Sequence, residues 1–168
     1  MSIMKPAIFF DRDGVLNHDL GYVHKPSDFK WIDGAIEAIK FLNHNGYLVI
    51  IVTNQSGLAR GYFSKEDLNN LHNWMNGVLL KKGARVDKIY YCPHHPDGLV
   101  ENYSIKCSCR KPEPGMIFQA INDLKVEASA SFLIGDKESD LQAAQSAGIK
   151  GYLFEGGDLF NFLKEILI

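Results

Sequence analysis

The apolar run Tyr47–Thr53 constrains the fold more than any other segment of the chain. Its sequence, YLVIIVT, is almost continuously apolar and rich in β-branched residues, which favours a strand buried on both faces over a strand with one solvated side. Strands of this kind occur in parallel sheets that carry helices on both faces. The run therefore predicts an α/β protein.

The rest of the chain alternates strand-like and helix-like segments. Further strands are expected at Ala7–Phe10, Lys88–Tyr91, Ser131–Ile134 and Gly151–Phe154. Helices with an apolar stripe are expected at Ala35–Asn43, from a capping box at Ser64 and Asp67 through Leu79, at Met116–Leu124 after Pro114 in the first turn, at Ser139–Ala147 and at Leu159–Ile166. This alternation predicts a doubly wound, Rossmann-like parallel sheet with helices on both faces.

Composition bounds the classes of function. The chain has 168 residues, 46% of them hydrophobic and 23% charged, and shows no repeat or linker, so a single domain over residues 1–168 is expected. A net charge of -2 without a long Lys/Arg run argues against nucleic acid as a partner. The apolar stretch near the N-terminus is too short for a signal peptide, so we expect a cytoplasmic protein with no membrane partner. Nothing in the sequence demands more than a monomer.

Polar residues follow four of the predicted strands directly, or after a loop. These clusters are Asp11 and Asp13, Thr53 and Asn54, Arg110 and Lys111, and Gly135 and Asp136. Ligands of open α/β sheets bind at the carboxyl ends of the strands, so the clusters are expected to meet at one edge. An Asp-x-Asp pair alone is as readily a solvated turn or a helix cap. The convergence of four clusters is what favours a functional site.

The clusters resemble the motifs of the haloacid dehalogenase-like phosphohydrolase superfamily. The matching segments are Asp11–Val15 (DRDGV), Thr53, Lys111 and Gly135–Asp140 (GDKESD). The resemblance implies that Asp11 is a nucleophile that forms an aspartyl-phosphate, and that Asp13 acts as general acid and then as general base. It also implies that Thr53 and Lys111 hold phosphoryl oxygens, and that Mg²⁺ is bound by Asp11, Asp136 and the backbone carbonyl of Asp13.

These implied roles are chemically consistent. A carboxylate attacks a phosphate dianion poorly unless a cation cancels their repulsion, and Mg²⁺ on Asp11 and Asp136 would do so. Lys111 would neutralise charge on the equatorial oxygens. Asp140 has two equally supported interpretations, since it could steady the metal shell or cap the helix that follows.

All three cysteines of the chain stand close to a pair of histidines. Cys92 and His94 form a C-x-H pair, and Cys107 and Cys109 form a C-x-C pair. Residues i and i+2 of an extended segment point to the same side, so each pair can offer two ligands. We expect a structural Zn²⁺ site of the Cys₃His type in a loop at about residues 92–109. A Cys107/Cys109 redox pair or inert thiols are the alternatives, and His95 is the competing fourth ligand.

The zinc loop narrows the resemblance. The segments Thr53–Phe63, Cys92–Pro96 and Cys109–Met116 are similar to those of D-glycero-D-manno-heptose 1,7-bisphosphate 7-phosphatases. The resemblance implies removal of the C7 phosphate in nucleotide-activated heptose synthesis for lipopolysaccharide or another surface glycan. It also implies contacts with the sugar phosphate from Asp19, Leu20, Gly21, Tyr22, Thr53, Asn54, Gln55, Ser56, Arg110 and Lys111, with Lys137 as a further candidate.

Two other functions remain open at this point. Histidinol-phosphate phosphatases share the first motif and the zinc loop, although the insertion His95–Lys106 is longer here than is typical of them. A zinc-stabilised module that binds a phosphorylated ligand without turnover is the alternative of another class. His18, His24, His44 and His72 have no spaced ligand partners, so surface or loop positions are expected for them.

Overall fold

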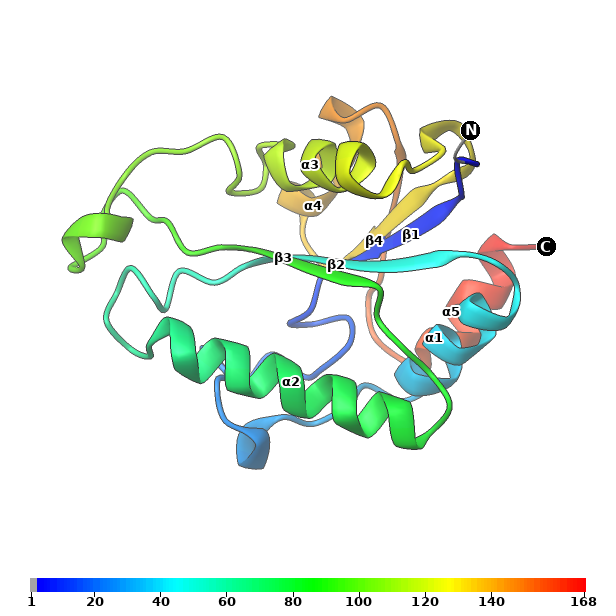
Figure 1. The fold of residues 1–168 in the computed structure, drawn as a ribbon, viewed down its shortest axis with the longest axis horizontal. Coiled ribbons are helices and arrows are strands. Elements are labelled where there is room, and N and C mark those ends of the chain that lie inside the picture. Colours follow the sequence, from blue (N-terminus) through cyan, green and yellow to red (C-terminus); the bar gives the residue numbers. More distant parts are fainter. Residues whose placement is uncertain (1–2) are drawn as a thin grey trace.

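A five-stranded parallel sheet forms the centre of the protein (Figure 1). The structure is a computed structural model that describes residues 3–168. Its strands are β1 (Ala7–Phe10), β2 (Leu48–Asn54), β3 (Lys88–Cys92), β4 (Phe132–Gly135) and β5 (Lys150–Leu153), in the spatial order β3-β2-β1-β4-β5. Every neighbouring pair is parallel. The predicted fold class and all five strands are confirmed, with bounds that differ by a residue at some ends.

Five α-helices cover the two faces of the sheet. They are α1 (Ala35–His44), α2 (Lys65–Lys81), α3 (Gly115–Leu124), α4 (Glu138–Ser146) and α5 (Leu159–Ile166). In Figure 1, α1, α2 and α5 lie on one side of the strands, and α3 and α4 lie on the other. The capping box of Ser64 and Asp67 opens α2 as predicted. Pro114 stands at the N-cap of α3 instead of in its first turn.

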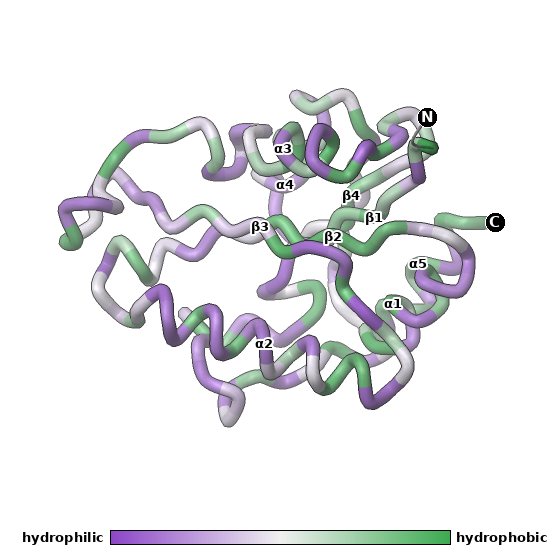
Figure 2. The backbone as a smooth tube through the Cα atoms, in the orientation of Figure 1, coloured by the Kyte–Doolittle hydropathy of each residue, from purple (hydrophilic) through white to green (hydrophobic). Residues whose placement is uncertain are grey.

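Strand alternation explains why both faces are apolar. Phe9 and Ile50 belong to the core cluster that includes α3 and α4, whereas Ile8, Phe10 and Ile51 belong to the cluster that includes α1, α2 and α5. All five side chains are fully buried. Successive residues of a strand point to opposite faces, so a continuously apolar strand fills both cores. Figure 2 shows this apolar character along β1, β2 and β4.

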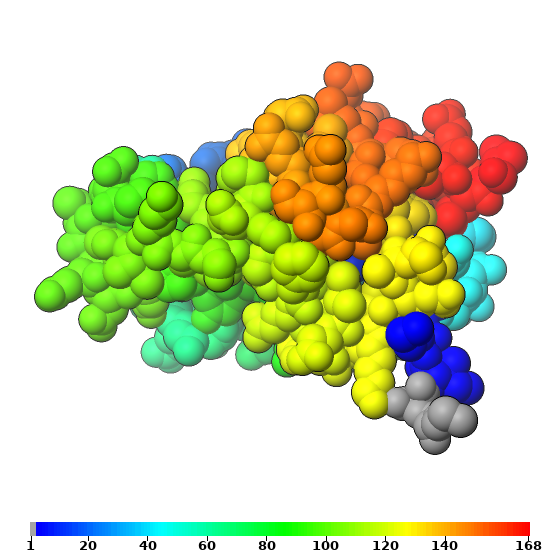
Figure 3. All heavy atoms as spheres, turned by 90° about the horizontal axis from the view of Figure 1, so that it is seen from above, coloured from blue at the N-terminus to red at the C-terminus, as the bar shows by residue number. Residues whose placement is uncertain are grey.

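The connection between β3 and α3, residues 93–114, contains no α-helix. It contains a short 3-10 helix, Glu101–Tyr103, and carries the predicted zinc loop. Figure 3 shows this part of the chain, in green, as a protrusion at one end of the molecule. The protrusion lies beside the carboxyl ends of β2 and β3, so it is placed to form one wall of a site there (Figure 1). Within residues 3–168, no helix has the length and apolarity needed to cross a bilayer.

Candidate active site

Lys111 lies at the centre of the carboxyl edge of the sheet. Its Nζ donates to Asp11 Oδ1 at 2.9 Å, to the carbonyl oxygen of Val52 at 2.9 Å, and forms an ion pair with Asp140 Oδ1 at 2.6 Å. Asp11 directly follows β1, Val52 lies in β2, and Asp140 lies in the first turn of α4. Burial alone would lower the pKa of Lys111, but the two carboxylates outweigh it and raise that pKa. The ammonium therefore stays charged in the interior.

The backbone of Lys111 is fixed by Asn54. Asn54 Nδ2 donates to the Lys111 carbonyl at 3.1 Å, and the Lys111 N-H donates to Asn54 Oδ1 at 3.0 Å. A side chain that pairs with both backbone groups of one residue holds that residue much as a strand neighbour would. The end of β2 thereby positions a lysine that follows the zinc loop.

Asp13 is surrounded by hydrogen-bond donors. Its Oδ1 accepts from Arg12 at 2.8 Å and from Asn17 at 3.0 Å, and its Oδ2 accepts from Gln55 Nε2 at 2.9 Å. Burial would raise the pKa of Asp13, but the Arg12 charge and the three hydrogen bonds lower it below its usual range. Without substrate, Asp13 is therefore an ionised carboxylate that can accept a proton.

Asp11 has the opposite electrostatic environment. Burial raises the pKa of Asp11 to about 8, with the negative charges of Asp140 and Asp13 adding to the increase and Lys111 opposing it. Asp11, Asp136 and Asp140 bring carboxylate oxygens within 4.8 Å of one another. Asp136 Oδ1 is buried without a hydrogen-bond partner. Clustered carboxylates with an unpartnered oxygen are a donor set for a hard cation.

Two positions explain how the acidic residues come so close together. Gly14 has φ of 90°, and a Cβ there would overlap the Asp136 carboxylate. Asp140 Oδ2 accepts the backbone N-H groups of Asp136 at 3.0 Å and Lys137 at 3.1 Å, which caps the start of α4. The helix-cap interpretation of Asp140 is therefore confirmed, whereas its support of a metal shell stays a prediction. Asp140 also pairs with Lys111 beside Asp11.

A cavity of about 570 Å³ opens over these groups. The predicted site residues that line it are Asp11, Asp13, Asp19, Gly21, Tyr22, Asn54, Gln55, Ser56, Arg110, Lys111 and Lys137. Thr53 lies behind the wall, buried, where its Oγ1 accepts from Gln55 Nε2 at 2.9 Å. Leu20 is 57% exposed and is not among the lining residues.

Arg60 also lines the cavity, and the sequence analysis missed it. Its guanidinium carbon lies 6.0 Å from the centre of the Tyr22 ring, and its NH2 lies 3.4 Å from His95 Nε2. Arg60, Arg110 and Lys137 are less buried than Asp11 and Lys111, so they add positive charge to the outer part of the cavity. Asp19 also lines it, with Oδ2 4.0 Å from Lys137 Nζ. In the sequence, Arg60 is only a basic residue four positions after the Thr53–Ser56 segment. That spacing does not predict a cavity contact unless the fold is known.

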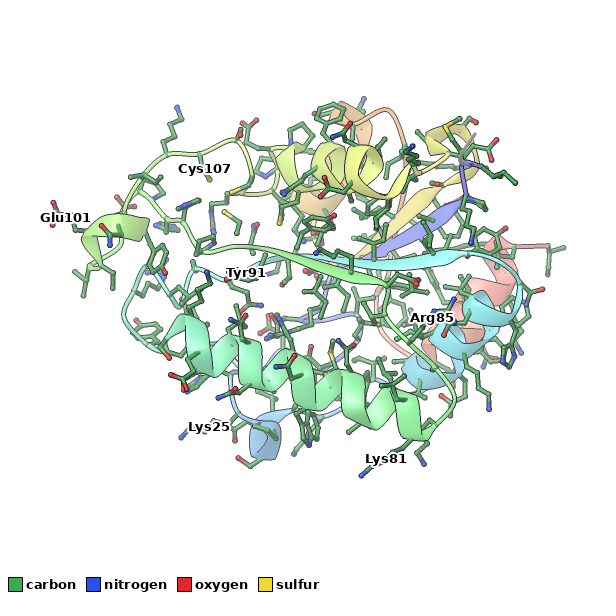
Figure 4. The ribbon with its side chains drawn as sticks, in the orientation of Figure 1. Lys25, Lys81, Arg85, Tyr91, Glu101 and Cys107 are labelled. Atoms are coloured by element: carbon green, nitrogen blue, oxygen red, sulfur yellow. The ribbon has the colours of Figure 1, made fainter. Side chains whose placement is uncertain are left out.

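The four predicted zinc ligands converge. Cys92, His94, Cys107 and Cys109 present ligand atoms within 4.8 Å of one another. Cys92 Sγ lies 2.9 Å from Cys109 Sγ and 3.5 Å from Cys107 Sγ, and His94 Nδ1 lies 3.3 Å from Cys109 Sγ. Figure 4 shows Cys107 on the loop that faces the end of β3. His95, the competing ligand, is not part of this group and pairs with Arg60 instead.

The expectation of a surface or loop position for His72 is wrong. His72 lies on α2 and is only 6% exposed. Its Nε2 lies 3.1 Å from Arg12 NH1. A buried arginine needs acceptors, and no sequence spacing could indicate that a helix residue so far along the chain supplies one.

Family models match two parts of the chain. One, described as haloacid dehalogenase-like hydrolase, matches residues 8–71, and another, described as HAD-hydrolase-like, matches residues 108–159. The first match includes Asp11, Asp13 and Thr53, and the second includes Lys111 and Asp136. The matches therefore contain all four polar clusters of the predicted edge.

Two curated relatives match most of the chain. The chain is 47% identical over 164 residues to D-glycero-beta-D-manno-heptose-1,7-bisphosphate 7-phosphatase of Rhodopseudomonas palustris, covering 98% of this chain and 91% of that protein. It is 52% identical over 147 residues to the enzyme of the same name from Pasteurella multocida, covering 88% and 79%.

A crystal structure shows the same architecture. D,D-heptose 1,7-bisphosphate phosphatase from B. bronchiseptica, complexed with magnesium and phosphate, superposes with a TM-score of 0.85 at 35% identity, covering 96% of this chain and 98% of that chain. The fold, the edge residues and relatives matched over most of their length agree, so the chain belongs to the D-glycero-D-manno-heptose 1,7-bisphosphate 7-phosphatase family of haloacid dehalogenase-like hydrolases.

Proposed function

We propose that this protein hydrolyses the C7 phosphate of D-glycero-D-manno-heptose 1,7-bisphosphate. The observation that carries the proposal is the contact of Lys111 with Asp11 at 2.9 Å, at the floor of a cavity that also holds Asp13. The two relatives named for this activity are 47% and 52% identical to this chain over the aligned residues. A nucleophile, a cation beside it and a proton carrier are the groups that a phosphomonoesterase requires.

The first chemical step uses Asp11 and Asp13. A carboxylate oxygen of Asp11 forms a bond to phosphorus while the bond from phosphorus to the C7 oxygen breaks. Asp13 gives a proton to that departing oxygen, which leaves as the sugar hydroxyl. Although Arg12 and its other donors lower the pKa of Asp13, an incoming phosphate dianion raises it again by like-charge repulsion, which allows Asp13 to carry that proton.

The second step regenerates the enzyme. Asp13, now a carboxylate held by Arg12, Asn17 and Gln55, removes a proton from a water molecule that attacks the phosphorus. The bond from phosphorus to Asp11 breaks and inorganic phosphate leaves. Lys111 stays within hydrogen-bond distance of Asp11 and supplies positive charge throughout both steps. Thr53 supplies a buried hydroxyl behind the floor of the cavity.

The acidic residues fit Mg²⁺. Asp136 Oδ1 is buried without a partner, and the absence of a Cβ at Gly14 lets Asp136 approach. Both oxygens of Asp140 are already used by Lys111 and the start of α4, so we propose that Asp11, Asp136 and the backbone carbonyl of Asp13 would hold the ion. When bound, Mg²⁺ supplies charge neutralisation between the carboxylate nucleophile and the phosphate.

The cysteine and histidine cluster fits Zn²⁺. Ligands of a tetrahedral zinc site lie on the order of 3.5 Å apart, given bonds of about 2.3 Å to sulfur, and the Sγ and Nδ1 atoms here lie 2.9 to 3.6 Å apart. We propose a structural role, because Cys109 directly precedes Arg110 and Lys111. Three reduced thiols in one site are also consistent with a cytoplasmic location.

The outer part of the cavity fits a second phosphate. Arg110, Arg60 and Lys137 line it, while Asp11 and Lys111 lie at its floor. A guanidinium can bind phosphate oxygens through two parallel hydrogen bonds, so Arg110 is the proposed anchor for the C1 phosphate. A substrate with a phosphate at each end can therefore be oriented with C7 at Asp11.

Parallel kinetics test the proposal. Phosphate release in excess Mg²⁺ is measured with both anomers of the heptose bisphosphate, histidinol phosphate and glucose 6-phosphate. We expect the highest kcat/KM with a heptose bisphosphate. Asp11→Asn should abolish turnover, whereas Asp28→Asn, at an exposed position, should be unchanged. Preference for histidinol phosphate would replace the proposed substrate, and tight binding without phosphate release would indicate a non-catalytic module.

A further inference from the structure

Arg12 stands between the two catalytic aspartates, but its side chain turns away from the cavity. It is the largest of the fully buried side chains in the described part of the chain. Its NH2 donates to Asp13 Oδ1 at 2.8 Å and to the carbonyl oxygen of Val23 at 2.8 Å. Its NH1 lies 3.1 Å from His72 Nε2. The guanidinium therefore links the proton carrier of the site to helix α2.

The state of His72 follows from this contact. A guanidinium has only donors, so His72 Nε2 must accept the hydrogen bond, and the imidazole must be neutral with its proton on Nδ1. Burial and, to a smaller extent, the Arg12 charge together lower the pKa of His72 to about 3. His72 is thus a fixed acceptor that stays neutral.

Behind His72 lies a second cavity of about 450 Å³ between α2 and β3. Its lining includes His72, Asn76 and Tyr91. Figure 4 shows Tyr91 at the end of β3, on the side that faces α2. If the imidazole is removed, Arg12 NH1 loses its acceptor and gains space on this side, which would draw the guanidinium away from Asp13.

We propose that His72 is a positioning residue for phosphoryl transfer: it holds Arg12, and Arg12 holds the Asp13 carboxylate in the orientation that protonates the leaving oxygen. The inference rests on the proposed function. It assigns a role to a helix residue on the opposite side of Arg12 from the substrate cavity. Displacing a catalytic group by about 1 Å can lower the rate about 100-fold. Loss of the His72 contact that holds Arg12, and through it Asp13, should therefore lower the rate measurably.

A comparison of two leaving groups separates this role from a purely structural one. The value of kcat/KM reports on the steps up to the first bond cleavage. A sugar oxygen leaves poorly and needs the proton from Asp13, whereas 4-nitrophenolate leaves without it. Loss of Asp13 orientation should therefore lower kcat/KM for the heptose bisphosphate and spare 4-nitrophenyl phosphate.

The variants form a matched set. His72→Leu removes the acceptor, and His72→Gln restores one through its amide oxygen. Asn76→Leu alters the lining of the same cavity, four residues along the same helix. We expect His72→Leu to lose about 10-fold to 100-fold in kcat/KM for the heptose bisphosphate. The loss for 4-nitrophenyl phosphate should be less than about 3-fold, and His72→Gln and Asn76→Leu should stay near wild type with both substrates.

Three results overturn the inference. They are an unchanged His72→Leu enzyme, an equal loss with both substrates, and a His72→Gln enzyme as impaired as His72→Leu. If His72→Leu does not fold, His72→Ala is assayed with added imidazole, which can enter the second cavity. Recovery of the sugar substrate's kcat/KM supports the inference, and no recovery contradicts it. A wild-type enzyme that fails on the heptose bisphosphate refutes the proposed function, whereas an active wild type beside an unaffected His72→Leu refutes the inference alone.

Discussion

Replacing Asp140 by alanine should destabilise the protein strongly, although Asp140 is not expected to touch the substrate's reacting atoms. The residue is 1% exposed. It accepts from Lys111 Nζ at 2.6 Å through Oδ1, and from the N-H groups of Asp136 and Lys137 at 3.0 and 3.1 Å through Oδ2. The substitution therefore removes one partner of a buried ion pair and also the cap of α4.

The expected magnitude follows from these contacts. Removal of one partner from a buried ion pair costs about 3 to 5 kcal/mol, and the lower end applies because Lys111 keeps Asp11 as a partner. Loss of the helix cap costs about 1 kcal/mol more. We expect the free energy of unfolding to fall by roughly 4 kcal/mol in Asp140→Ala, and by roughly 3 kcal/mol in Asp140→Asn, which can keep an oxygen at the cap.

Urea unfolding at pH 7, followed by far-UV circular dichroism, measures both values. Glu138→Ala is the control, because Glu138 is an exposed acid in the first turn of the same helix. Its effect should stay below about 1 kcal/mol. A loss below about 1 kcal/mol in Asp140→Ala, or a loss equal to that of the control, would refute the assignment of Asp140 as a buried support for Lys111.

Three further outcomes are expected. Gly14→Ala should lower kcat/KM about 100-fold or more, because φ of 90° strains alanine and its Cβ overlaps Asp136; wild-type kinetics would contradict the close approach. Zinc removal by a chelator, or Cys107→Ser, should lower the melting temperature and weaken activity through Arg110 and Lys111; metal analysis that finds no zinc in protein purified without chelators would contradict the site. The pKa of His72 is about 3 in the folded state, so below pH 6.5 the unfolded state binds a proton at His72 that the folded state does not. The free energy of unfolding should therefore fall on acidification, and His72→Gln should remove about 2 kcal/mol of the loss between pH 7 and pH 5. Identical pH profiles of stability in the two proteins would contradict this.

Features with a local pattern could be predicted from the sequence. The continuous apolar run of β2 required two cores, and Ile50 and Ile51 fill one each. The capping box at Ser64 fixed the start of α2, where both hydrogen bonds form. The spacing of Cys92 and His94, and of Cys107 and Cys109, indicated two ligand pairs, and the four ligand atoms lie within 4.8 Å of one another.

Features that depend on long-range contacts could not be predicted. The hydrogen bond of Arg12 to His72 joins the loop after β1 to α2, which only the fold places beside it. Arg60 reaches the cavity wall because its loop folds back over Tyr22. Asp140 combines two roles because its two oxygens face different groups, and a sequence pattern does not carry the direction of each oxygen.

Asp11 is expected to carry the phosphoryl group during turnover. The most direct measurement uses heptose bisphosphate labelled with ³²P at C7, mixed with enzyme and Mg²⁺ and quenched in acid within one turnover. Proteolysis and mass spectrometry should then find label on the peptide that contains Asp11 in the wild type, and none in Asp11→Asn. Phosphate release without label on that peptide, together with retained turnover in Asp11→Asn, would contradict the account.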